Sequence, residues 1–137
     1  MRPVENLTHL CEAYKLLSLY AYGSRGTAAS RFILSGKPMP ASESDLDIGV
    51  LPEQPLSVKE KVQLTLELEA LFNVSRVDLV VLPEADPFLA ANIIRGERLY
   101  ERDSYQADEY DLYILRRAGD LAPLEHERMA LILGKDK

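Results

Sequence analysis

A short apolar run is interrupted by two carboxylates and reads Ser44-Asp45-Leu46-Asp47-Ile48-Gly49-Val50. Residues two apart in a β-strand point to the same side of a sheet. As a strand, this run places both carboxylates on one face and its aliphatic side chains in a core. Neighbouring carboxylates repel each other unless a cation lies between them, and a hard, oxygen-seeking ion such as Mg²⁺ suits that position. The alternative is a solvated charge pair, because an Asp-x-Asp pattern is not specific by itself.

The composition is that of one folded domain. The chain has 137 residues, of which 47% are hydrophobic, and this is enough to bury a core. Its net charge of −6 argues against direct binding of long nucleic acid, because surfaces that bind phosphate chains are usually basic. A single cysteine, Cys11, excludes an internal disulfide and fits a reducing compartment. With no membrane-spanning run and no signal-peptide pattern, we expect a cytoplasmic protein without a membrane partner.

A second feature precedes the carboxylates. Residues 17–22 are expected to form a strand that stops at Gly23-Ser24, and a helix is expected over residues 25–32. A strand, a glycine turn and a helix N-terminus form an anion site, because free N–H groups and the helix dipole favour negative charge. Arg25 and Arg31 are candidates for charge-assisted contacts to phosphate. The alternative is an ordinary tight turn in which the serine caps the helix.

A third carboxylate lies in a later strand. Residues 76–82 are apolar and rich in β-branched side chains, which predicts a strand in the centre of the sheet. Asp78 is the exception in this run, because a carboxylate in a buried strand is costly unless a cation or hydrogen bonds meet it. It either pairs with Arg76 on the same face or faces a metal ion beside Asp45 and Asp47.

The remaining segments are expected to form the scaffold. Ser57 and Glu60 form a capping-box pattern that predicts the start of a helix, a second helix is expected over residues 84–95, and Leu99-Tyr100 fits a short closing strand. Residues 35–44 lack periodicity, and we favour a surface insertion over a loop that contacts substrate. Residues 104–133 are expected to form two amphipathic stretches separated near Gly119 and Pro123. The sequence leaves open whether this tail packs on its own domain or forms a partner surface.

Together these segments resemble the DNA polymerase β-like nucleotidyltransferase superfamily, and most closely its minimal nucleotidyltransferase (MNT) branch. The matching stretches are residues 21–25, 44–50, 77–81 and 93–100, the last being a helix that ends in a glycine before a Leu-Tyr pair. The resemblance covers residues 5–100 and leaves the tail out. The 35–44 loop makes the spacing from Ser24 to Asp45 longer than the usual pattern. The arginine-glycine pair that usually follows Gly-Ser-Arg is absent here, where residues 26–31 read Gly-Thr-Ala-Ala-Ser-Arg.

The resemblance implies an α/β (α+β) fold with a small mixed sheet flanked by helices. The nucleotidyltransferase domain would span residues 1–103, and a helical C-terminal tail would span 104–137. The resemblance also implies ATP as co-substrate and Mg²⁺ as cofactor, with two ions. The roles that the resemblance implies are carried over position by position. Gly23 and Ser24 would bind the triphosphate, and Arg25 would contact phosphate. Asp45, Asp47 and Asp78 would bind metal and take part in catalysis.

The resemblance implies a partner as well. Small MNT proteins are commonly paired with a HEPN-domain RNase toxin, and the family's antitoxin moves AMP from ATP to a tyrosine of that toxin. The sequence has no arginine-x4-6-histidine motif of the HEPN type, so we expect the MNT half alone, with the tail as a candidate surface for oligomerisation. The chain length leaves no room for an additional substrate domain, which favours a protein acceptor. Two alternatives stay open: adenylylation of a small hydroxylated molecule, and a catalytically idle module that neutralises its partner by contact.

Overall fold

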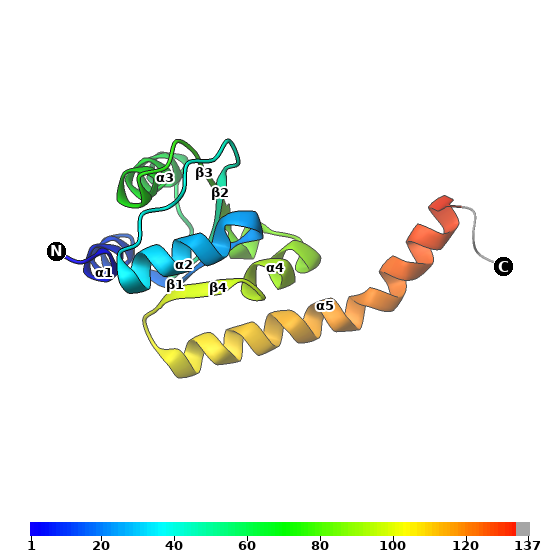
Figure 1. The fold of residues 1–137 in the computed structure, drawn as a ribbon. Coiled ribbons are helices and arrows are strands. Elements are labelled where there is room, and N and C mark those ends of the chain that lie inside the picture. Colours follow the sequence, from blue (N-terminus) through cyan, green and yellow to red (C-terminus); the bar gives the residue numbers. More distant parts are fainter. Residues whose placement is uncertain (134–137) are drawn as a thin grey trace.

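The computed structural model describes residues 1–133 and contains a four-stranded sheet with helices on both faces (Figure 1). The strands are β1 (Leu16–Tyr22), β2 (Leu46–Pro52), β3 (Val77–Val81) and β4 (Glu97–Glu101). The helices are α1 (Pro3–Ala13), α2 (Gly26–Ser35), α3 (Val58–Phe72), α4 (Pro87–Ile94) and α5 (Ser104–Leu133), with short 3₁₀ turns η1 (Gly23–Arg25) and η2 (Leu82–Glu84). The predicted α/β class, with a small mixed sheet and a helical C-terminal segment, is confirmed.

The strand order is β3-β2-β1-β4, in which β1 runs antiparallel to β2 and β4, and β3 runs parallel to β2. The predicted closing strand at Leu99-Tyr100 is part of β4 at one edge. The prediction that residues 76–82 lie in the centre of the sheet is wrong, because β3 forms the other edge. Val77 and Val81 join the main core on one face of β3, and Val80 is half-buried on the other, whereas Asp78 is exposed.

The two faces of the sheet carry different side chains. The aliphatic face packs against α1, α2 and α3, and its fully buried residues from β1 and β2 are Leu16, Leu19, Ala21, Leu46, Ile48 and Val50. The opposite face, here called the tyrosine face, carries Tyr20 and Tyr22 and packs against α4 and α5. The alternation predicted for residues 44–50 is therefore confirmed, and Asp47 projects from the tyrosine face.

Side-chain caps fix the starts of the helices that follow the two carboxylate strands. The predicted capping box is present, because Ser57 Oγ accepts from the N–H of Glu60 (3.1 Å) and Glu60 Oε1 accepts from the N–H of Ser57 (2.8 Å). Helix α4 begins at Pro87 rather than at the predicted Glu84. Asp86 is its N-cap and accepts from two N–H groups of the first turn (2.9 and 3.0 Å), and proline suits the first helical position.

Helix α5 is a single helix of 30 residues, so the prediction of two stretches separated near Gly119 and Pro123 is wrong. A proline inside a helix removes one hydrogen bond and bends the helix without necessarily ending it. The lost bond would have reached the carbonyl of Gly119, four residues earlier. Figure 1 shows α5 changing direction in its C-terminal part and extending away from the sheet.

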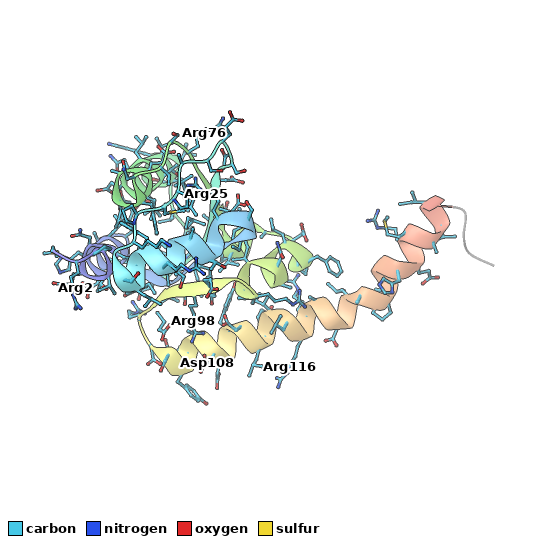
Figure 2. All side chains as sticks on the ribbon, viewed as in Figure 1. Arg2, Arg25, Arg76, Arg98, Asp108 and Arg116 are labelled. Atoms are coloured by element: carbon cyan, nitrogen blue, oxygen red, sulfur yellow. The ribbon has the colours of Figure 1, made fainter. Side chains whose placement is uncertain are left out.

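The first half of α5 docks on the tyrosine face. Its buried residues are Ala107, Ile114 and Ala118. The Tyr20 hydroxyl donates to the carboxylate of Asp111, and Arg98 of β4 donates to the same carboxylate at 2.9 Å. Arg98 also donates to Asp108 at 2.8 Å, and Figure 2 shows these two residues where β4 faces α5. The tail thus packs on its own domain over its first half and projects beyond it over the second.

Candidate functional site

The three predicted metal-binding aspartates lie at the same end of neighbouring strands. Asp45 directly precedes β2, Asp47 is the second residue of β2, and Asp78 is the second residue of β3. Asp47 is paired with Asp78 in the parallel register of β2 and β3, and with Tyr22 in the antiparallel register of β1 and β2. Strand pairing therefore brings together carboxylates that are 31 positions apart in the sequence.

The glycine-serine turn lies against the same carboxylates. Gly23 follows the last residue of β1 and has a left-handed φ of +71°. A Cβ atom on Gly23 would lie only 2.5 Å from Oδ2 of Asp47. Gly23 and Ser24 are exposed and lead through η1 into α2, and the first N–H groups of a helix have no acceptor within it. The predicted anion-binding turn and the predicted metal-binding aspartates are thus parts of one site.

Asp47 experiences the excess negative charge of this site. Burial raises its pKa above the ordinary carboxyl value, and the charges of Asp78 and Asp45 raise it further. Burial, together with Asp47 and Asp78, also raises the pKa of Tyr22 to about 12, so this hydroxyl stays protonated near neutral pH. For both groups the neighbouring carboxylates add to the larger effect of burial. A bound divalent cation would offset the negative charge of those carboxylates.

The donor chemistry of the aspartates fits Mg²⁺, which prefers carboxylate, phosphate and water oxygens. In the part of the chain that the structure describes, no three Asp, Glu, His or Cys side chains form a ready-made metal cluster. The aspartates are adjacent through the strand register rather than gathered into a cage. This arrangement is compatible with Mg²⁺, which commonly takes one or two carboxylates and completes its shell with water and substrate phosphates.

The arginines near the site have different partners. The Nε atom of Arg76 lies 3.6 Å from Oδ1 of Asp45, and both side chains are exposed, so the pair adds little stability. Arg76 is therefore the partner of Asp45 rather than of Asp78. Arg25 is only 8% exposed and donates to two main-chain carbonyls of the 35–44 loop. Arg31 is exposed beside residues 37–40 of that loop. Figure 2 labels Arg25 and Arg76.

Two features of the site were not predicted from the sequence. One is Tyr22, which is paired with Asp47 across β1 and β2. The alternation of side chains in residues 17–22 was the signal for it, because this alternation puts Tyr22 on the same face as Tyr20. The other feature is the attachment of the 35–44 loop. Although most of this loop is exposed, Met39 packs against the aliphatic core. A stretch without periodicity carries no local signal for such an anchor.

A comparison with protein families finds a match over most of the chain. The family described as polymerase beta nucleotidyltransferase matches residues 5–105. The chain belongs to this family. It is therefore a nucleotidyltransferase, as the resemblance implied, and its three aspartates and glycine-serine turn lie within the matched residues. A comparison with curated protein sequences found no match.

Solved structures of similar fold extend this result. A chain from a toxin–antitoxin structure with AMP-PNP is 25% identical, with a TM-score of 0.66 and coverage of 94% of both chains. A chain from tri-AMPylated Shewanella oneidensis HEPN toxin in complex with MNT antitoxin is 22% identical, covers 95% of this chain and 92% of its own, and has a TM-score of 0.65, which supports the fold. A putative minimal nucleotidyltransferase is 26% identical, covers 71% and 94%, and has a TM-score of 0.50. The nucleotidyltransferase thus shares its fold with MNT proteins over nearly its whole length.

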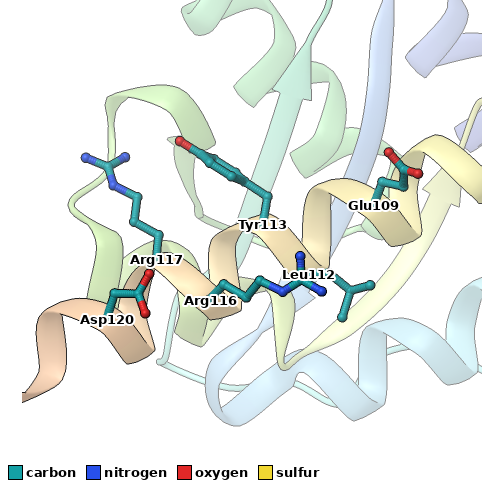
Figure 3. Close-up of a pocket in the computed structure, with 6 residues that line it drawn as sticks. All are labelled: Glu109, Leu112, Tyr113, Arg116, Arg117 and Asp120. Carbon is teal, nitrogen blue, oxygen red and sulfur yellow. The ribbon is translucent and has the colours of Figure 1, made fainter.

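A large hollow lies away from the aspartates. It has a volume of about 750 Å³ and follows one side of α5 (Figure 3), where its lining residues are Glu109, Leu112, Tyr113, Arg116, Arg117 and Asp120. None of these residues belongs to the candidate nucleotidyltransferase site. The site is instead an open edge of the sheet. Over residues 1–133, no helix has the length and apolar character needed to cross a membrane.

Proposed function

We propose that this nucleotidyltransferase moves AMP from ATP to a tyrosine hydroxyl of a HEPN-domain toxin and so acts as its antitoxin. The observation that carries the proposal is the row of Asp45, Asp47 and Asp78 beside the Gly23-Ser24 turn. Two structures of similar fold support it, because one holds AMP-PNP and the other contains an AMPylated HEPN toxin with its MNT antitoxin.

The glycine-serine turn would bind the triphosphate. Gly23 lets a phosphate approach the main chain closely because it has no side chain and adopts a left-handed φ. The N–H groups at the start of η1 and α2 and the hydroxyl of Ser24 supply donors to phosphate oxygens. The α-phosphate would then lie next to Asp47, whose Oδ2 atom faces the Gly23 backbone.

The aspartates would hold Mg²⁺ beside that phosphate. Asp45 and Asp47 are the expected ligands of the ion that binds the triphosphate. Asp78 and Asp47 are the expected ligands of a second ion. Bound Mg²⁺ neutralises phosphate charge and lowers the pKa of an attacking hydroxyl. The acceptor oxygen bonds to the α-phosphorus, the bond from that phosphorus to the bridging oxygen breaks, and pyrophosphate leaves. Asp78, the most exposed of the three, would accept the hydroxyl proton.

The openness of the site favours an acceptor carried by a macromolecule. Gly23, Ser24 and Asp78 are all exposed, and the large hollow of the molecule lies elsewhere, on α5. A small acceptor is usually held in a concave pocket that buries most of its surface. A tyrosine on a folded partner needs no such pocket, because the partner's own surface can orient the hydroxyl.

The test is transfer of label from ATP. The wild-type chain is incubated with Mg²⁺ and ATP labelled at the α-phosphate, with and without the product of its neighbouring gene, and every chain is then analysed by mass spectrometry. The matched variants are Asp45→Asn, which removes a proposed metal ligand, and Asp108→Asn, which makes the same change at a carboxylate that is 66% exposed on α5.

An AMP-sized gain on a tyrosine of the partner, lost in Asp45→Asn and kept in Asp108→Asn, is the expected result. If no chain gains mass while the partner is still bound and inhibited, the protein is a contact antitoxin and the proposal is wrong. Transfer to small hydroxylated compounds in the absence of any protein acceptor would also overturn the choice of acceptor.

A further inference from the structure

Arg25 is a buried cation between the glycine-serine turn and the 35–44 loop. It follows the glycine-serine turn directly, and its side chain is 8% exposed. Its Nη1 atom donates to the carbonyl of Ser44 at 3.1 Å, and its Nη2 atom donates to the carbonyl of Pro40 at 2.6 Å. Burying a guanidinium is costly unless hydrogen bonds compensate it. These two bonds to carbonyl oxygens are therefore a substantial part of what holds the side chain in place.

The two carbonyls belong to the segment that delivers the chain to β2. Pro40 lies in the middle of the 35–44 loop, and Ser44 is the residue immediately before Asp45. On the other side of Asp45, the N–H of Leu46 donates to the carbonyl of Arg76 at 3.0 Å. The main chain around Asp45 is therefore held from both sides, by the Arg25 side chain on one and by the start of β3 on the other.

A loop of this length needs such an anchor. Residues 36–45 contain no helix or strand, and fixing the backbone of an irregular segment costs conformational entropy at every residue. Three other anchors are weaker. Met39 is only partly buried against the core, and the Ser42 hydroxyl accepts one bond from the N–H of Ser44 on the exposed side. The ion pair between Arg76 and Asp45 is exposed and 3.6 Å long. Without Arg25, the residue before Asp45 would be free to sample several conformations.

We infer that Arg25 is a positioning residue, which holds the 35–44 loop and thereby places Asp45 for metal binding, rather than a ligand of the triphosphate. The side chain is 8% exposed, and both of its terminal nitrogens already donate to main-chain carbonyls, which leaves little of it accessible to a phosphate. One side chain thus couples the phosphate turn, from which it projects, to the first aspartate. The inference rests on the metal role given to Asp45 under the proposed function.

The experiment measures the amide exchange of the loop, the affinity for metal and the affinity for nucleotide separately. Hydrogen–deuterium exchange reports the amides of residues 36–46, titration calorimetry with Mn²⁺ reports metal binding without nucleotide, and calorimetry with ATP in excess EDTA reports nucleotide binding without metal. The variants are Arg25→Gln, which is neutral, and Arg25→Lys, which keeps the charge and can reach one carbonyl. Arg2→Gln is the control, because Arg2 is 78% exposed at the far end of α1.

In Arg25→Gln we expect faster exchange confined to the loop and an affinity for Mn²⁺ lowered by about 10- to 100-fold, as is typical when a partner that orients a metal ligand is lost. The affinity for ATP in EDTA should change by less than about twofold, which is about 0.4 kcal/mol, because in this account Arg25 does not contact the triphosphate. Arg25→Lys should recover part of both effects, and Arg2→Gln should show neither. If Arg25→Gln does not fold, Arg25→Lys carries the same comparison.

The opposite pattern would overturn the inference: weaker binding of ATP in EDTA, with unchanged Mn²⁺ affinity and unchanged exchange in the loop, would make Arg25 a phosphate contact. None of these measurements requires transfer of AMP. A chain that transfers no AMP but shows the loop and Mn²⁺ effects would contradict the proposed function while leaving the role of Arg25 intact.

Discussion

The backbone of Gly23 and the carboxylate of Asp47 lie so close that a Cβ on the glycine would be 2.5 Å from Oδ2 of the aspartate. This contact joins the turn that precedes α2 to the strand that carries the Asp-x-Asp pair. It leaves no room for any side chain at position 23 and makes the two halves of the site geometrically dependent on each other.

Gly23→Ala should therefore disturb the site beyond its effect on the backbone. Gly36 is the matched control, because it has a similar φ of +76° but nothing within 4 Å of an added Cβ. Each alanine should cost about 1–2 kcal/mol of folding free energy, since left-handed backbone disfavours a Cβ. Only Gly23→Ala should also weaken Mn²⁺ binding and transfer. Urea unfolding and calorimetry check this, and equal effects of both variants on metal binding would contradict it.

Asp47→Asn should affect stability and activity in opposite directions. The pKa of Asp47 is raised by burial and by its neighbouring carboxylates, so its charged form is disfavoured in the folded protein. A neutral amide of the same shape should leave metal-free stability unchanged or raise it by less than about 1 kcal/mol, because the site is partly exposed. Transfer should fall by more than about 100-fold, because a metal ligand is lost. Thermal unfolding in EDTA tests the prediction for stability, and the labelled-ATP assay tests the prediction for AMP transfer. A large loss of stability in EDTA would contradict the electrostatic explanation.

The stability of the metal-free chain should depend on pH through the same residue. A carboxyl whose pKa is raised on folding contributes stability below its unfolded pKa and loses that contribution as the pH rises through the folded value. The stability of Asp47→Asn relative to wild type should therefore increase from about pH 4 upward and then level off. Saturating Mg²⁺ should reverse the difference near neutral pH, because the ion binds the charged form. Urea unfolding of both proteins from about pH 4 to neutral pH, first in EDTA and then in Mg²⁺, measures this difference in stability. If the difference does not change with pH, Asp47 is not the source of the pH dependence.

The docking of α5 should depend on one of its two acidic contacts to Arg98. Asp111 is 22% exposed and accepts from Arg98 and from Tyr20, whereas Asp108 is 66% exposed. Asp111→Asn should cost about 1–3 kcal/mol, because it weakens a half-buried network, and Asp108→Asn less than about 1 kcal/mol. Urea unfolding gives the free energies, and hydrogen exchange in the first half of α5 should accelerate only in Asp111→Asn. Equal costs at the two positions would mean that burial does not set the strength of these pairs.

Much of the site could be predicted because it follows from local patterns. The alternation in residues 44–50 determines which side chains enter the core, and a glycine between a strand and a helix indicates an anion-binding turn. An unexplained carboxylate in an apolar strand indicated Asp78. What these patterns left open was the pairing of strands. The strand of Asp78 was expected in the centre of the sheet but lies at its edge, because helices and loops can cover an edge strand and leave it as apolar as a central one.

The sequence alone thus determined the family and the two faces of β2, and it predicted the residues of the candidate site, because strand periodicity and turn chemistry depend on neighbours along the chain. Only the tertiary structure decided that Asp47 pairs with Asp78, that Arg25 holds the 35–44 loop, and that α5 continues through Pro123 as one helix. The first two outcomes depend on contacts between segments that are distant in sequence. The third depends on whether a proline bends a helix or ends it. A local sequence pattern does not specify either of these.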